Sequence, residues 1–145
     1  MRLNQITVVG LSVLLLFALC LAGCNRNKVD TIRVTGTVTL DGKPVEMGAI
    51  KFYAEDGNSP GGGGVIKDGA YIANVPPGKK KVVINGNKVV GTEKVYDTPD
   101  SPMRDKIEQI TPPIYNSTYN SPLRADVSKE NKEFNFDLDS KIKSN

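Results

Sequence analysis

Residues 32–45 read IRVTGTVTLDGKPV, and this stretch decides the fold class. Apolar and polar residues alternate over 32–40, and this period of two predicts a half-buried strand rich in β-branched residues. Gly36 interrupts the apolar side, as a bulge or a close-packing site would. Because Asp41-Gly42 is a signal for a tight hairpin turn, we expect the chain to fold back after residue 40.

Short runs of the same kind continue to the end of the chain, with turn signals between them. They cover about residues 48–54, 65–66, 71–75, 82–84 with an extension toward 90, 123–127 and 134–138. Helical periodicity is nearly absent, so the pattern predicts an all-β domain built as a β-sandwich. The predicted core consists of the inward residues of these runs: Ile32, Val34, Val38, Leu40, Ile50, Phe52, Val65, Tyr71, Ala73, Val75, Val82, Ile84, Leu123, Ala125, Val127, Phe134, Phe136 and Leu138.

Three segments between and after these runs read as irregular. Residues 56–64 contain five glycines and a proline, which predicts a flexible loop with no side chains able to pack. Residues 91–113 form a long polar connection with four prolines, in which Met103 to Ile110 are compatible with one or two helical turns. Residues 140–145 are polar and are expected to form a flexible tail.

The N-terminus has the layout of a processing signal. One positive charge precedes an apolar run over 6–21, which is shorter than the roughly 20 residues that span a bilayer comfortably. The run ends in Leu21, Ala22, Gly23 and Cys24, which resembles the bacterial lipobox. The alternative is an uncleaved anchor helix whose cysteine is incidental.

The lipobox resemblance implies a lipid-anchored protein outside the cytoplasm. Residues 1–23 would be a lipoprotein signal peptide, and Cys24 would carry the diacylglyceryl group with its acyl chains, such as palmitate. Residues 24–30 would then be a lipidated tether, and the membrane would be a partner through Cys24. Asn25 follows that cysteine in place of the aspartate that favours inner-membrane retention in some bacteria, so the outer membrane is favoured.

The body of the chain carries a second resemblance. The stretch from Val34 to Phe52 contains a G-x-V phrase, a D-G-x-P turn and a following strand, and D-G-x-Y and V-P-P-G turns follow at 68–71 and 75–78. This order is similar to that of a carboxypeptidase regulatory-like domain, which would cover residues 31–139. The ending, residues 112–138, is similar to the last strands of small bacterial lipoproteins built on that domain.

That resemblance implies a fold but no chemistry. The family fold is a seven-stranded β-sandwich of the Ig-like or transthyretin-like kind, with no catalysis and no cofactor. One position departs from the family pattern, because Lys80 occupies an inward slot that usually holds an aromatic residue. A lysine stem can lie along apolar surface with its ammonium in water, so we expect the fold to tolerate it.

Composition excludes several classes of function. The 145 residues include 19 Lys plus Arg, 16 Asp plus Glu and no histidine, for a net charge of +3. Without histidine, the chain has no Ser-His-Asp or Cys-His catalysis and no His-ligated zinc. Cys20 and Cys24 both lie near the N-terminus, so no disulfide staples the body. A charge of +3 is too small to predict a nucleic-acid partner.

Charged clusters are interpreted as ordinary surface. Lys79–Lys81, with Lys88 and Lys94, are expected to form a solvated face, with an anionic membrane or cell-wall surface as the alternative partner. Two acidic pairs, Asp97 with Asp100 and Asp137 with Asp139, lack the dense oxygen pattern of a calcium loop, so we predict no metal site.

Polar and aromatic residues suggest few sites beyond these. The glycines at 61–64 lack the Lys-Ser/Thr pair of a phosphate cradle, and Glu55 and Asp56 point to opposite faces, so they cannot act as an acid–base pair. Tyr115 is expected to pin a loop through its hydroxyl, as in a corner motif.

Three functional interpretations follow. The favoured one is a non-enzymatic, lipid-anchored envelope protein with structural or interaction roles at the cell surface or in the periplasm, and with an envelope protein or glycan partner. The alternative is a ligand-binding module for carbohydrate, with Tyr53, Tyr96 and Tyr119 as the available aromatic platform. An enzyme is disfavoured, because its nucleophile and base would have to work without histidine or a free thiol.

Overall fold

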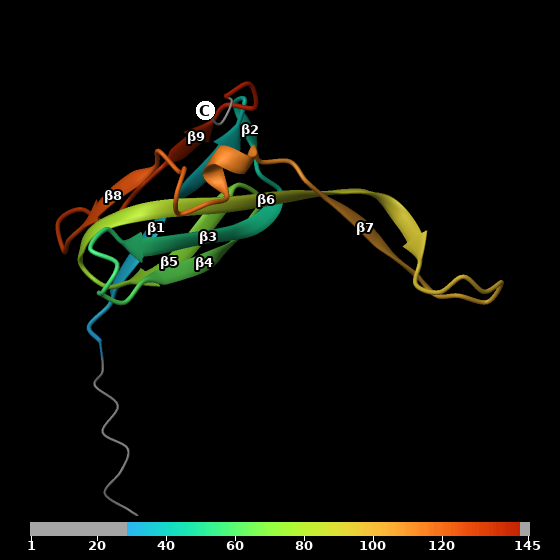
Figure 1. The fold of residues 1–145 in the computed structure, drawn as a ribbon, viewed down its shortest axis with the longest axis horizontal. Helices are drawn as coiled ribbons and strands as arrows, with labels where there is room; N and C mark the ends of the chain where they lie inside the picture. The colour runs from blue at the N-terminus through green and yellow to red at the C-terminus, as the bar shows by residue number, and fades with distance from the viewer. Residues whose placement is uncertain (1–28, 143–145) are drawn as a thin grey trace, which may run out of the picture.

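The computed structural model describes residues 29–142, and this part of the chain is almost entirely β-structure (Figure 1). Among these residues there is one 3₁₀ turn, η2 (Pro113–Tyr115), and no α-helix. The all-β prediction is therefore confirmed. The strands are β1 (Ile32–Leu40), β2 (Lys43–Pro44), β3 (Met47–Ala54), β4 (Gly62–Lys67), β5 (Ala70–Val75), β6 (Gly78–Lys94), β7 (Met103–Gln109), β8 (Arg124–Val127) and β9 (Phe136–Leu138).

The strands form one curled, mostly antiparallel sheet. Its hydrogen-bonded order is β2-β1-β5-β4-β3-β6-β7, while β8 pairs with β6 and β9 runs parallel to β1. Figure 1 shows the strands of the body curling back on themselves, with β6 running through the body and onward into a projecting hairpin. All nine strands belong to one sheet, so the structure does not confirm a seven-stranded sandwich.

Two Asp-Gly turns connect neighbouring strands as the sequence predicts. Asp41 and Gly42 have φ angles of 50° and 77°, and Asp68 and Gly69 have φ angles of 50° and 78°. Two consecutive positive φ angles are the mark of a type I′ turn, whose twist matches that of antiparallel strands. The first turn returns β1 into β2, and the second returns β4 into β5.

Gly36 is a close-packing site, as predicted. A Cβ atom there would overlap the carbonyl oxygen of Phe134, which lies on the segment that passes beside β1. The hydroxyl of Tyr71 donates a hydrogen bond of 2.8 Å to the same carbonyl. The missing side chain therefore lets the C-terminal segment approach β1 and closes the core on that side.

The core contains all but one of the predicted inward residues. Thirteen of them are buried, and Ile32, Leu40, Leu123 and Phe134 are half-buried against this core. The prediction for Val65 is wrong, since it is 73% exposed while Ile66 is 0% exposed. The pairing of Ile66 with Tyr71 gives β4 a register that turns Ile66 inward. Val45 and Tyr115 also belong to the core and were not in the predicted set.

The glycine run is not a flexible loop, so that prediction is wrong for 62–64. These residues begin β4 and pair with β3 on one side, and Gly63 pairs with β5 on the other. A Cβ atom on Gly64 would overlap the carbonyl oxygen of Ile72. The neighbouring strands therefore approach closely where these glycines lie, which is the packing reason for a glycine in a strand interior.

The predicted irregular connection over 91–113 is instead mostly a long hairpin, and the predicted helical turn over Met103–Ile110 is wrong. β6 continues to Lys94, and β7 pairs with it from Asn87 to Lys94, with a bulge between Val89 and Gly91. Cross-strand pairing replaces helical hydrogen bonds here. We call residues 88–109 the β6–β7 arm, and Figure 1 shows it projecting from the body.

Several predictions concern residues beyond the described range. The signal peptide (1–23), the lipobox Leu21–Cys24 and the tether as far as residue 28 lie outside it, as do residues 143–145 of the predicted tail. Within residues 29–142, no helix has the length and apolar character needed to cross a membrane.

The register of β4 can be tested with two neighbouring substitutions. Ile66→Ala should lower the free energy of unfolding by about 2–5 kcal/mol, because it opens a cavity in the core. Val65→Ala, one residue away, should change it by less than about 0.5 kcal/mol. Chemical denaturation of both variants measures the difference, and equal losses, or a larger loss for Val65→Ala, would contradict this register.

Candidate functional site

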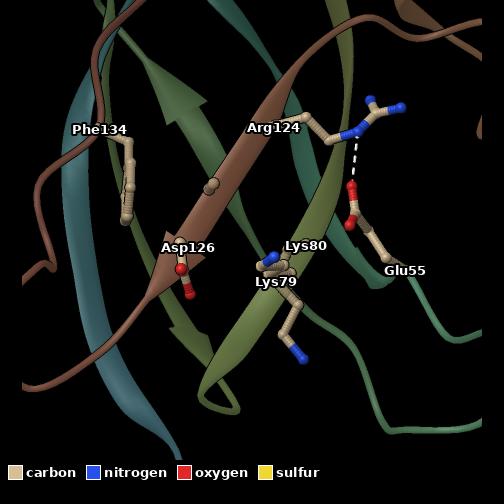
Figure 2. A pocket seen from close by; sticks show the side chains of 7 residues that line it. Glu55, Lys79, Lys80, Arg124, Asp126 and Phe134 are labelled. Carbon is tan, nitrogen blue, oxygen red and sulfur yellow. Dashed lines mark ion pairs between the residues drawn. The ribbon is translucent and has the colours of Figure 1, made fainter.

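The candidate site is a cleft of about 320 Å³ at the start of β6. It is bounded by the end of β3, the first residues of β6, strand β8 and the segment before β9, and its lining residues are Glu55, Lys79, Lys80, Arg124, Ala125, Asp126 and Phe134 (Figure 2). The pairing of Lys80 with Ala125 brings β6 and β8 together here, although more than 40 residues separate them in sequence. The cleft therefore depends on the sheet topology.

An ion pair bridges one side of the cleft. Arg124 Nε lies 2.6 Å from Glu55 Oε1, and a dashed line marks this ion pair in Figure 2. Arg124 also donates hydrogen bonds of 2.8 Å and 2.9 Å to the carbonyl oxygens of Ser121 and Leu123. Both charged side chains are partly exposed, and such pairs contribute little to stability. The guanidinium thus mainly ties the entry of β8 to the end of β3.

Lys80 is the unusual residue of the cleft. Its inward position is confirmed, but its ammonium does not reach open water, because the residue is only 1% exposed. Lys80 Nζ instead donates a hydrogen bond of 3.4 Å to the carbonyl oxygen of Pro60. Burying an ammonium with only one long hydrogen bond lowers the free energy of unfolding relative to an apolar side chain at the same core position.

The loop that accepts this hydrogen bond is held in shape by Asp56. Its carboxylate accepts hydrogen bonds from the backbone N–H groups of Asn58 and Ser59, each of 3.0 Å, and from the Ser59 hydroxyl at 2.6 Å. These bonds, those from Ser59 above all, hold the pKa of Asp56 below its usual value. Asp56 and Glu55 therefore have separate partners, the loop at 58–59 and Arg124.

The predicted basic face does not form as one surface. Within the run Lys79–Lys81, Lys79 is exposed, Lys80 is buried and Lys81 is half-buried. Lys88 and Lys94 lie further along β6, on the arm. Strand alternation and the length of β6 separate these charges, so the prediction of one solvated lysine face is wrong for Lys80.

The acidic pairs have protein partners or lie apart from other ligands. Asp137 accepts a hydrogen bond from the Thr39 hydroxyl, and Asp139 Oδ1 accepts one of 2.8 Å from the backbone of Lys141. Asp97 and Asp100 lie near the tip of the arm. In the described part of the chain, no group of three or more Cys, Asp or Glu side chains is placed to hold a metal ion.

Two tyrosines have structural roles. The Tyr115 hydroxyl accepts a hydrogen bond of 3.2 Å from the backbone N–H of Asp139, so it pins η2 to the end of β9. Burial raises the pKa of the Tyr71 phenol, which donates to the Phe134 carbonyl. Both hydroxyls hold the C-terminal segment against the body.

The β6–β7 arm is a second candidate surface, and the sequence analysis did not identify it. Every residue of β7 is exposed, including Met103 and Ile107. Tyr96 is also exposed and follows the end of β6, whereas Tyr53 pairs with Lys81 near its start. These two members of the predicted aromatic platform therefore lie at opposite ends of β6. The apolar residues of 103–109, Met103 and Ile107, are four positions apart, so the sequence carries no period-two signal for a strand here.

Known proteins resemble this chain only weakly. No family model and no curated protein matches it. Among solved structures, it is similar to a 9R-lipoxygenase from Cyanothece PCC8801, with 11% identity and a TM-score of 0.33. That match covers 80% of this chain but 17% of the lipoxygenase chain, and a likeness of this size carries no conclusion about fold or activity.

Lys80 can be tested against its exposed neighbour. Lys80→Met keeps the apolar stem but removes the buried charge, so it should raise the free energy of unfolding by about 1 kcal/mol. Lys79→Met, at an exposed position, should change it by less than about 0.5 kcal/mol. Both are measured by chemical denaturation. A loss of stability in Lys80→Met alone would mean that the ammonium is needed for folding.

Proposed function

We propose that this chain is a non-enzymatic, lipid-anchored protein of the cell envelope whose β-domain presents the β6–β7 arm for contact with a partner. The observation that carries the proposal is the arm itself, because β7 is exposed at every residue. A segment that adds so little to the core is better suited to interaction than to folding. An exposed edge strand presents backbone hydrogen-bonding groups to a partner.

The lipid anchor is proposed from the N-terminal sequence. An apolar run followed by Leu21, Ala22, Gly23 and Cys24 has the residue types and spacing of a lipobox. Two or more acyl chains on Cys24 would hold the protein stably at a membrane, which one chain would not. We place the mature protein outside the cytoplasm, with the outer membrane favoured by Asn25.

We also infer that the curled sheet is a variant of the transthyretin-like sandwich of carboxypeptidase regulatory-like domains. The two Asp-Gly turns and the Pro-Pro-Gly break after β5 fall where the motifs of that family would put them. The β6–β7 arm would then be an extension of one strand pair of that sandwich.

The contacts of the cleft favour a non-enzymatic role. Glu55 and Arg124 are engaged with each other, and Lys80 is engaged with the Pro60 carbonyl. These groups hold chain segments together. Tyr53 and Tyr96, two of the three tyrosines expected to form a carbohydrate-binding platform, lie at opposite ends of β6. We therefore do not propose the carbohydrate-binding alternative.

Fractionation of cells that express the full chain tests the anchor. Cys24→Ala should move the protein out of the detergent-extracted membrane fraction or leave it unprocessed at full length, because the acyl chains cannot attach. Cys20→Ala is the matched control and should change neither result. Mass spectrometry of the wild-type protein should find residues 1–23 removed and lipid on Cys24, and an intact, unlipidated N-terminus would refute the anchor.

A further inference from the structure

We propose that the arm binds a second copy of this chain, by antiparallel edge-to-edge pairing of β7 with β7 of that copy in a register centred on Ile107. The inference deepens the proposed function and rests on its assignment of the arm as an interaction surface. β7 pairs with β6 along one edge, and among residues 29–142 no strand pairs with its other edge. Such an edge is a template for pairing with another chain.

Two hydrogen bonds show which backbone groups of β7 point toward β6 and which point away from it. Ile110 N–H donates to the Gly86 carbonyl and Val95 N–H donates to the Pro102 carbonyl, each over 2.9 Å. Residues 102 and 110 therefore face β6. Because backbone groups alternate along a strand, the odd-numbered residues from 103 to 109 direct their N–H and C=O groups away from β6. Ile107 lies among them, so two copies of it can exchange both hydrogen bonds.

The order of charges along β7 favours this register. The strand reads MRDKIEQ, with alternating charges at 104, 105 and 106 and a further negative charge at 108. A two-fold register centred on any of these charged residues would place that residue opposite itself, which is destabilising. Centring on Ile107 instead places Lys106 opposite Glu108 of the second copy, and the symmetry repeats the pair.

The remaining neighbours also fit this pairing. Arg104 is already held by Glu93, with Nη2 2.6 Å from Oε1, so it does not compete for the new partners. Ile107 is directly opposite Val89 in the arm and is 53% exposed. A two-fold axis perpendicular to the sheet would put both Ile107 side chains on the same face, beside both Val89 side chains. Pairing would therefore join two small apolar clusters into one.

Self-complementarity is the reason to name a second copy as the occupant. Charged side chains on an edge strand normally prevent pairing with other strands. Here one register converts the charges at 106 and 108 into two opposite-charge pairs, and only a strand with the same sequence supplies both at once. An unrelated partner strand would have to reproduce this order.

Charge reversal on the full chain in mild detergent tests the proposal. Wild type should sediment as a monomer–dimer mixture, and Lys106→Glu or Glu108→Lys alone should weaken dimerisation by about tenfold, because each places like charges opposite each other twice. The double variant Lys106→Glu/Glu108→Lys should restore the wild-type dissociation constant. Lys106 and Glu108 are both exposed, so far-UV circular dichroism should be unchanged.

Cysteine cross-linking tests the register. Ile107→Cys should form a disulfide-linked dimer under oxidation, since paired Cα atoms about 5.5 Å apart lie within disulfide range. Met103→Cys is the matched control on the same strand with similar exposure. Its two copies would lie roughly 27 Å apart in this register and should not cross-link. The wild-type protein, which has the same N-terminus as both variants, provides the background.

The outcomes separate this proposal from the proposed function. A chain that stays monomeric, a dimer that is insensitive to both single reversals, or equal cross-linking at 103 and 107 would overturn the pairing. A variant in which Asn-Gly replaces residues 89–107 joins the paired Lys88 and Glu108 by a tight turn and should be monomeric. Membrane release by Cys24→Ala does not depend on the arm, so the anchor stands or falls by its own test.

Discussion

Strand β6 is the constraint on which the rest of the structure depends, because one continuous strand lies in two different environments. From Lys80 to Gly86 it pairs with β3, and its first residues also pair with β8, so Val82 and Ile84 are fully buried. Asn87 pairs with both Met47 of β3 and Gln109 of β7. From Lys88 onward, β7 is the only strand among the described residues that pairs with β6. The same backbone therefore forms the centre of the core and then leaves the body as the arm.

Both candidate surfaces follow from this division of β6. The cleft lies at the first residues of the strand, where Lys80 takes an inward position. An apolar side chain there would avoid the free-energy cost of burying an ammonium. The arm lies at its other end, where side chains on both faces are largely exposed.

Local patterns in the sequence were sufficient for much of the body. Alternation over 32–40 placed β1, and the two Asp-Gly pairs placed the type I′ turns, because both signals depend on neighbouring residues alone. The glycines at 62–64 suggested a loop where the structure has a strand, because their reason for being glycine lies in residues distant in sequence. Nothing beside Gly64 in the sequence shows that the carbonyl of Ile72 lies where a Cβ would be, since strand pairing brings the two together.

The arm and the cleft depended on long-range pairing and were beyond sequence reasoning. Prolines at 99, 102, 112 and 113 flank β7 but do not interrupt it, so a composition that favours an irregular connection surrounds a regular strand. The cleft joins Lys80 to Ala125 across the sheet, and no local pattern indicates that contact. The inward position of Lys80 was predictable from alternation. Its hydrogen bond to the Pro60 carbonyl was not, because the position of that carbonyl depends on how the loop after β3 folds.

Native-state amide hydrogen exchange at Val82 in β6 and at Val95, the residue directly after β6, tests most directly whether this strand runs through two environments. Val82 N–H donates to the Leu123 carbonyl over 3.0 Å and Val95 N–H donates to the Pro102 carbonyl over 2.9 Å, so both amides are hydrogen-bonded. The Val82 amide should exchange only through global unfolding, and the Val95 amide through a local opening of the arm at much lower free energy. Equal protection of the two amides would show that arm and core open as one unit, which contradicts the account.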